Sequence, residues 1–210
     1  MKKTLLITMI GLTTACNVFA QESATLSFTG PSSWVPGTPI TLSVQDTYMN
    51  LGGSYGFSYW LQVDTTVAPF LTITALSHLV FTEGYNGPFP ILFDPTTGID
   101  AVDLGAGNNP LILIPDGSYH VSDITFALAA GAPVGTYTLR TTTMNPRASA
   151  QSDANFNDVD IPQASFVFTV VPEPSTLALL GIGAVGSGML IYRRRKHRLI
   201  FCSTSDMEVI

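Results

Sequence analysis

Apolar and polar residues alternate with a period of two along much of the chain between residues 21 and 171. Residues 56–63 are the clearest case, because Phe57, Tyr59 and Leu61 fall on one face and Trp60 falls on the other. Such alternation is typical of strands with one buried face, and no long segment has the apolar spacing of a helix. The pattern predicts about nine strands, over residues 24–29, 39–45, 56–63, 71–82, 90–93, 111–114, 122–129, 135–143 and 164–171.

Short segments rich in Gly, Pro and Asn separate these predicted strands, as at residues 35–37, 86–88 and 107–110. Gly, Pro and Asn favour the backbone conformations of turns. Many short strands joined by turns predict an all-β fold, a two-sheet antiparallel sandwich of the jelly-roll or Ig-like kind. We expect residues 21–171 to form this sandwich, because their number suits one domain.

The first 20 residues have the three parts of a secretory signal peptide. Lys2 and Lys3 supply a positive start, residues 5–12 are apolar, and small residues lead up to Ala20. We therefore expect residues 1–20 to direct export and signal peptidase to cleave after Ala20. The exported body then contains no cysteine, because Cys16 and Cys202 lie outside it, and no disulfide can stabilise its fold.

The predicted body is strongly acidic. Residues 21–171 contain twelve Asp and Glu, and their only basic residues are Arg140 and Arg147, so the formal charge is −10. Binding to nucleic acid requires a Lys/Arg surface that neutralises phosphates. The charge therefore excludes nucleic acid as a partner.

An apolar segment near the C-terminus has the length of a membrane span. Residues 176–192 carry no charge, and at about 1.5 Å per residue they reach about 25 Å, close to the thickness of a bilayer core. Five basic residues follow, namely Arg193, Arg194, Arg195, Lys196 and Arg198. Because basic residues next to a span stay in the cytoplasm, we expect one C-terminal transmembrane helix with the body outside.

The segment before this span carries the motif Pro172-Glu173-Pro174. Its two prolines keep the backbone extended, so Glu173 is presented near the membrane surface. A Pro-Glu-Pro motif, an apolar helix and an Arg-rich cluster, in this order, resemble the PEP-CTERM sorting domain of Gram-negative, biofilm-forming bacteria. Residues 172–198 would then be a sorting signal and residues 199–210 a cytoplasmic tail, for which the sequence indicates no role.

The resemblance implies a partner and a route. An exosortase, a membrane cysteine transpeptidase, would recognise Pro172, Glu173 and Pro174 and process the protein. The chain would cross the inner membrane of a Gram-negative bacterium, be anchored there by its C-terminal helix, and then reach the cell surface or the exterior.

A second, shorter resemblance concerns the body. Residues 122–139, which end in Gly135-Thr136-Tyr137-Thr138-Leu139, resemble the penultimate hairpin of cohesin-like and carbohydrate-module-like jelly rolls. Small residues at the turn allow two strands to approach, and Tyr137 and Leu139 are expected in the core. This resemblance supports the predicted sandwich.

The body lacks the H-E-x-x-H and G-x-S-x-G motifs of metalloproteases and serine hydrolases. Its two histidines are expected in structural places, His78 in a strand and His120 in solvent near a turn. Asp100 and Asp103 form a carboxylate pair, the group that glycosidases use, so a secreted hydrolase remains an alternative.

One segment is a weak candidate for calcium. Asp153, Asn155 and Asn157 place oxygen-bearing side chains at alternate positions, as the first half of a calcium-binding loop does. The glycine expected at the sixth position and the glutamate expected at the twelfth are both missing. The alternative is a solvated loop between the last two strands.

Aromatic residues are the remaining candidates for binding, since aromatic rings can stack on the apolar faces of sugars. They are Trp34, Tyr48, Tyr55, Trp60 and Tyr85. The sequence thus predicts a non-catalytic exported protein that is sorted to the surface or to an extracellular polysaccharide matrix of a biofilm. A carbohydrate-binding module is the first alternative, and the hydrolase is the second.

Overall fold

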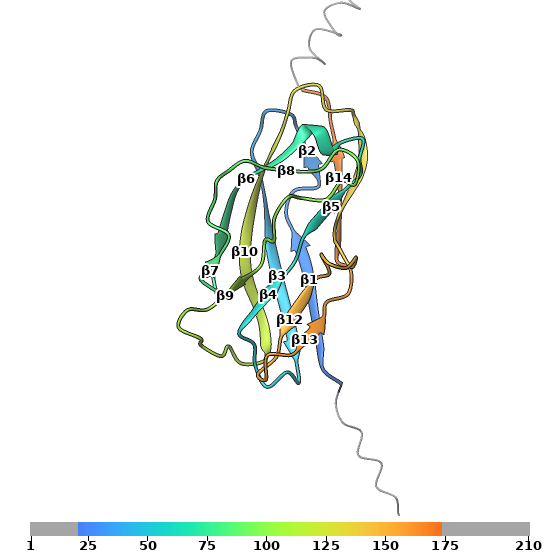
Figure 1. The fold of residues 1–210 in the computed structure, drawn as a ribbon. Coiled ribbons are helices and arrows are strands. Elements are labelled where there is room, and N and C mark those ends of the chain that lie inside the picture. Colours follow the sequence, from blue (N-terminus) through green and yellow to red (C-terminus); the bar gives the residue numbers. More distant parts are fainter. Residues whose placement is uncertain (1–20, 174–210) are drawn as a thin grey trace, which may run out of the picture.

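The computed structural model describes residues 21–173. Along its longer strands, buried and more exposed side chains alternate. On β3 (Ile40–Met49), every second side chain from Ile40 to Tyr48 is buried. The described residues form fourteen strands and one short 3-10 helix, η1 (Ala68–Phe70). The prediction of an all-β sandwich is therefore confirmed (Figure 1).

Three sheets make up the sandwich. The long sheet has the order β1 (Ser23–Thr29), β3, β10 (Gly117–Leu128), β6 (Leu71–His78) and β8 (Ile91–Leu92). The four-stranded sheet has the order β2 (Ser33–Trp34), β14 (Ser165–Val170), β11 (Gly135–Thr141) and β5 (Leu61–Val63). The short-strand sheet has the order β13 (Asp158–Asp160), β12 (Ala150–Ser152), β4 (Gly56–Ser58), β9 (Ala106–Gly107) and β7 (Glu83–Gly84). All pairings are antiparallel except that of β2 with β14.

The four-stranded and short-strand sheets lie end to end and together face the long sheet (Figure 1). The chain passes from one to the other between β4 and β5. There the N–H of Tyr59 donates to the Asp103 carboxylate at 3.0 Å, which takes this residue out of the strand ladder. The predicted strand at residues 56–63 is therefore two strands, and the second layer of the sandwich is two sheets.

Among the other predicted strands, the long ones are present, whereas the shortest strands of the structure were not predicted. The strands expected at residues 24–29, 39–45, 122–129, 135–143 and 164–171 are present, and β3 and β10 are longer than expected. No strand covers residues 111–114, where only Ile114 forms an isolated bridge, with Ser54. The strands β2, β7, β9, β12 and β13 were not predicted, because two or three residues are too few to show a period.

One end of the interior is apolar and aromatic. The Trp34 ring stacks on Phe168, with centroids 3.8 Å apart and an interplanar angle of 19°. Phe126 also packs against the indole, with centroids 5.5 Å apart and an interplanar angle of 33°. The indole N–H of Trp34 donates to the carbonyl oxygen of Pro31 at 2.7 Å, so its polar atom is paired inside the core.

The other end of the interior contains polar side chains. Asp46 of β3 is fully buried, and neither of its carboxylate oxygens has a hydrogen-bond partner among the described residues. Gln151 of β12 donates to the Ser54 hydroxyl at 2.6 Å, while its own Oε1 has no partner. A bulge after His120 in β10 turns Ser122 inward, where its hydroxyl lies 3.3 Å from that of Tyr59.

Two of the aromatic residues proposed for an exposed surface are buried instead. Trp34 and Tyr48 both have 0% exposure, so their prediction as sugar-stacking residues is wrong. Tyr48 continues the inward face of β3, and Trp34 is carried into the core where β2 pairs with β14. Period-two reasoning alone places Tyr48 inside, since it is in phase with Ile40, Leu42 and Val44.

Several predicted features lie outside the described residues. These are the signal peptide and Ala20, the transmembrane helix at residues 176–192, Pro174, the basic cluster at residues 193–198 and the tail at residues 199–210. Between residues 21 and 173 no helix has the length and apolar character needed to cross a membrane.

Candidate functional site

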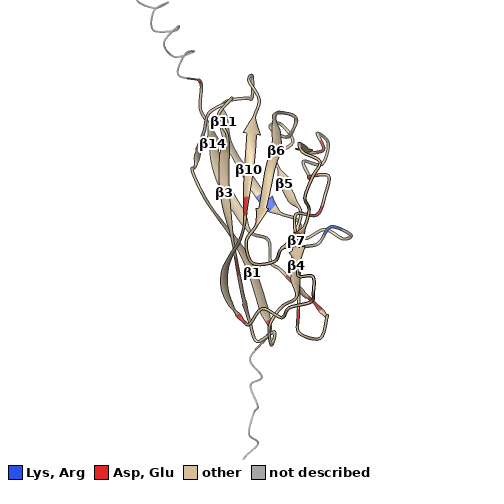
Figure 2. Cartoon of the chain, turned by 90° about the vertical axis from the view of Figure 1, so that its left-hand side faces the viewer, with Lys and Arg blue, Asp and Glu red and all other residues tan. Residues whose placement is uncertain are grey.

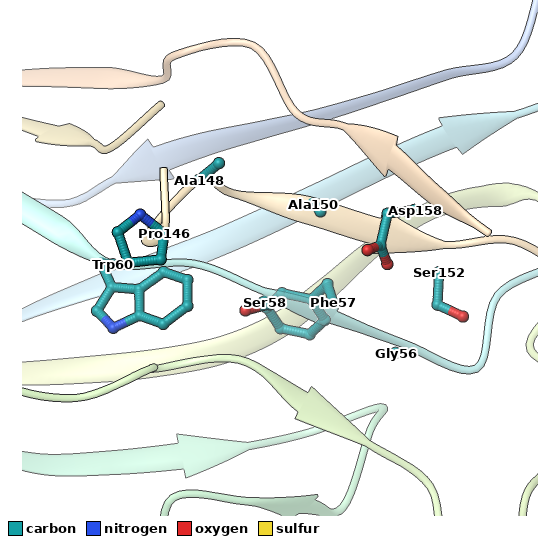
Figure 3. Close-up of a pocket in the computed structure, with 9 residues that line it drawn as sticks. All are labelled: Gly56, Phe57, Ser58, Trp60, Pro146, Ala148, Ala150, Ser152 and Asp158. Carbon is teal, nitrogen blue, oxygen red and sulfur yellow. The ribbon is translucent and has the colours of Figure 1, made fainter. Parts of the chain in front are cut away.

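A hollow of about 360 Å³ lies over the outer face of the short-strand sheet (Figure 3). Trp60 and Pro146 lie beside each other at one end, and Ser152 and Asp158 lie at the other. Phe57 and Ser58 line the middle. The hollow thus joins an aromatic surface to hydroxyl and carboxylate oxygens.

The sequence explains why Trp60 is accessible. Phe57, Tyr59 and Leu61 are buried, whereas Ser58 and Trp60 are only partly covered. This is the alternation of a strand with one face in the core. The prediction that Trp60 lies on the face opposite Phe57, Tyr59 and Leu61 is confirmed.

A second hollow, of about 400 Å³, adjoins the first and shares Gly56, Phe57 and Ser152 with it. Two more aromatic residues line it. Tyr55 and Phe156 stack with centroids 4.4 Å apart and an interplanar angle of 4°. We call the two hollows together the aromatic groove.

The close approach of β4 and β9 shapes the bottom of the aromatic groove. A Cβ atom on Gly56 would lie 2.6 Å from the carbonyl oxygen of Ala106 and 2.8 Å from the Cα of Gly107. Only glycine at position 56 lets the two strands come this near. The absence of side chains there leaves the groove open between its aromatic ends.

The aromatic groove is acidic. Asp158 lines the first hollow, and Glu83 and Asp103 line the second. No basic side chain lines either hollow. Figure 2 shows how few basic residues the described chain contains: Arg140 donates to Gln62 at 3.2 Å and Arg147 to the carbonyl oxygen of Asp100 at 3.1 Å. An anionic ligand would find no counter-charge in the groove.

Asp100 and Asp103 lie close in sequence, but they support the backbone rather than form an open carboxylate pair. Asp100 is fully buried, burial raises the pKa of its carboxyl well above the usual range, and it accepts the N–H of Leu61 at 3.2 Å. Asp103 accepts the N–H groups of Tyr59 and Gly105 at 3.0 and 2.8 Å. A substrate cannot reach Asp100.

The calcium candidates form a compact turn between β12 and β13. The Asp153 carboxylate accepts the backbone N–H of Asn155 at 2.8 Å, and both the backbone and side-chain N–H of Asn157 at 2.7 and 2.8 Å. The hydrogen bonds from Asn157 and Asn155 lower the pKa of Asp153. In residues 21–173 no three His, Cys, Asp or Glu side chains gather as metal ligands. These hydrogen bonds account for the turn, and calcium binding stays a prediction.

The two histidines have structural positions. His78 ends β6, as its prediction as a strand residue requires, and burial lowers the pKa of its half-buried ring. His120 lies within β10 rather than near a turn, and its Nε2 is 2.8 Å from the Asp123 carboxylate. Neither histidine lines the aromatic groove.

Sequence reasoning missed part of the aromatic groove. Phe156 stands alone among polar residues, so the sequence gives no sign of an aromatic partner. In the structure it is 60% exposed and stacked on Tyr55. Pro146 precedes β12 and reaches Trp60 from a distant part of the chain. Both contacts depend on the pairing of β12 with β4, which no local pattern reveals.

Comparison with known proteins supports both resemblances. The cohesin module of a family 33 glycoside hydrolase from Clostridium perfringens has a TM-score of 0.51 and 8% identity, over 73% of this chain and all of that one. CaCohA2 of Clostridium acetobutylicum, in its complex with CaDoc0917, has a TM-score of 0.50 and 16% identity, over 71% of this chain and all of that one.

At such low identities these likenesses show the fold alone, a cohesin-like β-sandwich. No curated protein sequence matches the chain significantly. The sorting motif is recognised independently, by a match of residues 170–196 to the family described as the PEP-CTERM protein-sorting motif. The chain therefore carries a PEP-CTERM sorting motif behind a cohesin-like β-sandwich.

Proposed function

We propose that the protein is an exosortase substrate, exported and sorted to the cell surface or extracellular matrix, where its sandwich serves as a non-catalytic component. The observation that carries this proposal is the sorting motif at residues 170–196. Its position in the fold agrees with that role. The motif begins at Val170, the last residue of β14, and the N–H of Val171 still donates to the Trp34 carbonyl oxygen at 3.0 Å.

The direction in which the chain leaves the sandwich also supports display outside a membrane. The first and last described residues lie at opposite poles of the molecule (Figure 1). If residues 176–192 cross the membrane, the pole that carries the β14 end faces it and the remaining sandwich points away. The aromatic groove, on the outer face of the short-strand sheet, then stays accessible.

The proposed route assigns a role to each terminal segment. Signal peptidase removes residues 1–20 after Ala20, and the C-terminal helix holds the protein in the inner membrane. The basic residues at 193–198 and the tail at 199–210 remain in the cytoplasm. The exosortase recognises Pro172, Glu173 and Pro174, and the sandwich of residues 21–171 becomes part of an extracellular polysaccharide matrix.

Mass spectrometry of the protein recovered from the cell exterior tests the proposal. We expect a mature chain that begins at Gln21 and ends near Pro174. The Glu173→Ala variant should accumulate with its C-terminal segment uncut, whereas Glu83→Ala, which removes an exposed glutamate elsewhere, should be processed normally. An unaltered chain that is intact through Ile210 at the cell exterior would contradict sorting.

A further inference from the structure

We propose that the aromatic groove binds a segment of an uncharged polysaccharide, with Trp60 and the Tyr55–Phe156 pair as stacking surfaces. This inference deepens the proposed matrix role and rests on it. It adds the binding surface and the ligand to that role. An experiment can reject this inference without rejecting the proposed function, and the reverse.

The aromatic residues supply the first argument. Trp60, between β4 and β5, is partly exposed, and Phe156 is 60% exposed although it is large and apolar. A ligand that covers such rings removes apolar surface from water, which favours binding. Both rings line the same groove, so a ligand lying in it would cover both.

The polar lining supplies the second argument. The exposed Asp158 carboxylate has no ion-pair partner among the described residues, and Ser152 lies beside it (Figure 3). An ionised carboxylate only accepts hydrogen bonds, so it suits a ligand that offers many O–H donors. Aromatic faces for C–H surfaces and oxygens for hydroxyl groups together match a sugar.

Charge decides which polysaccharide fits. Asp158, Glu83 and Asp103 line the groove, no basic side chain does, and the surrounding body carries a formal charge of −10. A uronate or phosphate polymer would be repelled, because like charges cost free energy in a partly desolvated site. The groove therefore disfavours anionic polymers, and an uncharged polysaccharide is the ligand that we propose.

The length of the groove favours a chain over a single sugar. The two hollows share Gly56, Phe57 and Ser152, so a ligand can extend from one into the other. Tyr55 and Trp60 are five positions apart, which in extended backbone corresponds to about 16 Å. That distance exceeds one sugar ring, and simultaneous contact with both ends therefore requires several linked residues.

Affinity electrophoresis of the full-length protein in detergent tests the proposal. The gels contain hydroxyethylcellulose, galactomannan or pullulan as uncharged polymers, or alginate as an anionic one. We expect at least one uncharged polymer to retard the protein and alginate to leave it unretarded. Trp60→Ala should weaken the retarding interaction about tenfold or more, and Phe156→Ala should weaken it too.

Tyr85→Ala is the matched control. Tyr85 is a partly exposed aromatic residue that lines neither hollow, so its loss should leave retardation unchanged. Thermal melting of each variant verifies that the fold is intact. Absence of retardation by all three uncharged polymers, equal retardation by alginate, or full retardation of a folded Trp60→Ala would overturn the proposal.

The outcomes also separate this inference from the proposed function. A protein that is correctly cut near Pro174 but is not retarded rejects the groove and leaves sorting in place. A protein that is retarded but remains uncut through Ile210 rejects sorting and leaves the groove in place.

Discussion

The two ends of the interior are held together by different forces. At the Trp34 end, aromatic rings of β2, β10 and β14 pack against one another, and the one polar atom of the indole is paired with the carbonyl oxygen of Pro31. At the Asp46 end, a buried carboxyl, an amide and three hydroxyl groups lie between the long sheet and the short-strand sheet. About seven residues of β10, from Tyr119 beside Asp46 to Phe126 beside Trp34, separate them, or about 23 Å.

This difference follows from strand length. The long strands β3, β10, β11 and β14 each bury several apolar side chains, which stabilise them through packing. The short-strand sheet has strands of two or three residues, which bury little and need specific hydrogen bonds. Gln151 supplies one of these hydrogen bonds. It points inward from β12 and donates to Ser54, while its neighbours Ala150 and Ser152 line the aromatic groove.

Trp34→Ala should have the largest effect on stability. The substitution removes a fully buried indole that stacks on Phe168 and Phe126, and a cavity replaces it. We expect the free energy of unfolding to fall by about 5 kcal/mol, measured by urea denaturation. Trp34→Phe keeps the ring contact and should lose clearly less. A loss below about 1 kcal/mol for Trp34→Ala would show that the apolar end is not the main source of stability.

Asp46→Asn should have the next largest effect, and of opposite sign. Burial raises the pKa of Asp46 from 3.8 to about 7. Between pH 3.8 and about pH 7 the folded protein keeps a proton on Asp46 that the unfolded chain has released. The contribution of Asp46 to stability is therefore full below about pH 4, is lost as the pH rises to about 7, and changes no further above that.

The Asn side chain carries no charge to bury, so the variant should be more stable than the unaltered protein at pH 8, by about 4 kcal/mol. The two should be nearly equal at pH 4. Urea denaturation at both pH values measures the difference. Asp160→Asn, which removes an exposed carboxylate, is the control and should show no comparable change between them. Equal stabilisation by Asp46→Asn at pH 4 and pH 8 would contradict a buried, titrating carboxyl.

The same contrast explains what the sequence could predict. The long strands were predictable because their alternation extends over six or more residues, as on β3 and β14. The exposure of Trp60 followed from the same periodicity. Asp46 breaks the pattern, because a carboxylate occupies an inward position between Val44 and Tyr48, and a sequence cannot show which distant groups surround it.

The aromatic groove was only half predictable. Trp60 and Tyr55 were candidates from the sequence, whereas Phe156 and Pro146 join them only through the pairing of β12 with β4, nearly a hundred residues apart in the chain. The exposed aromatic Phe156 in the polar turn after β12 was a usable signal, since a large apolar side chain there has no strand to cover it.

Tyr59→Phe should have the smallest effect and the sharpest diagnostic value for the polar end. Phe fills the same space, so no cavity forms, but the buried Ser122 hydroxyl loses the partner that lies 3.3 Å away. We expect a loss of about 1 kcal/mol in the free energy of unfolding. Burial raises the pKa of the Tyr59 hydroxyl, so it stays neutral and the loss should be the same at pH 5 and pH 8.

The double variant Tyr59→Phe with Ser122→Ala removes both hydroxyls and should recover most of the loss. A double variant that loses the sum of the two single effects would show that the two hydroxyls stabilise the interior independently, and that the polar end is not a hydrogen-bonded unit.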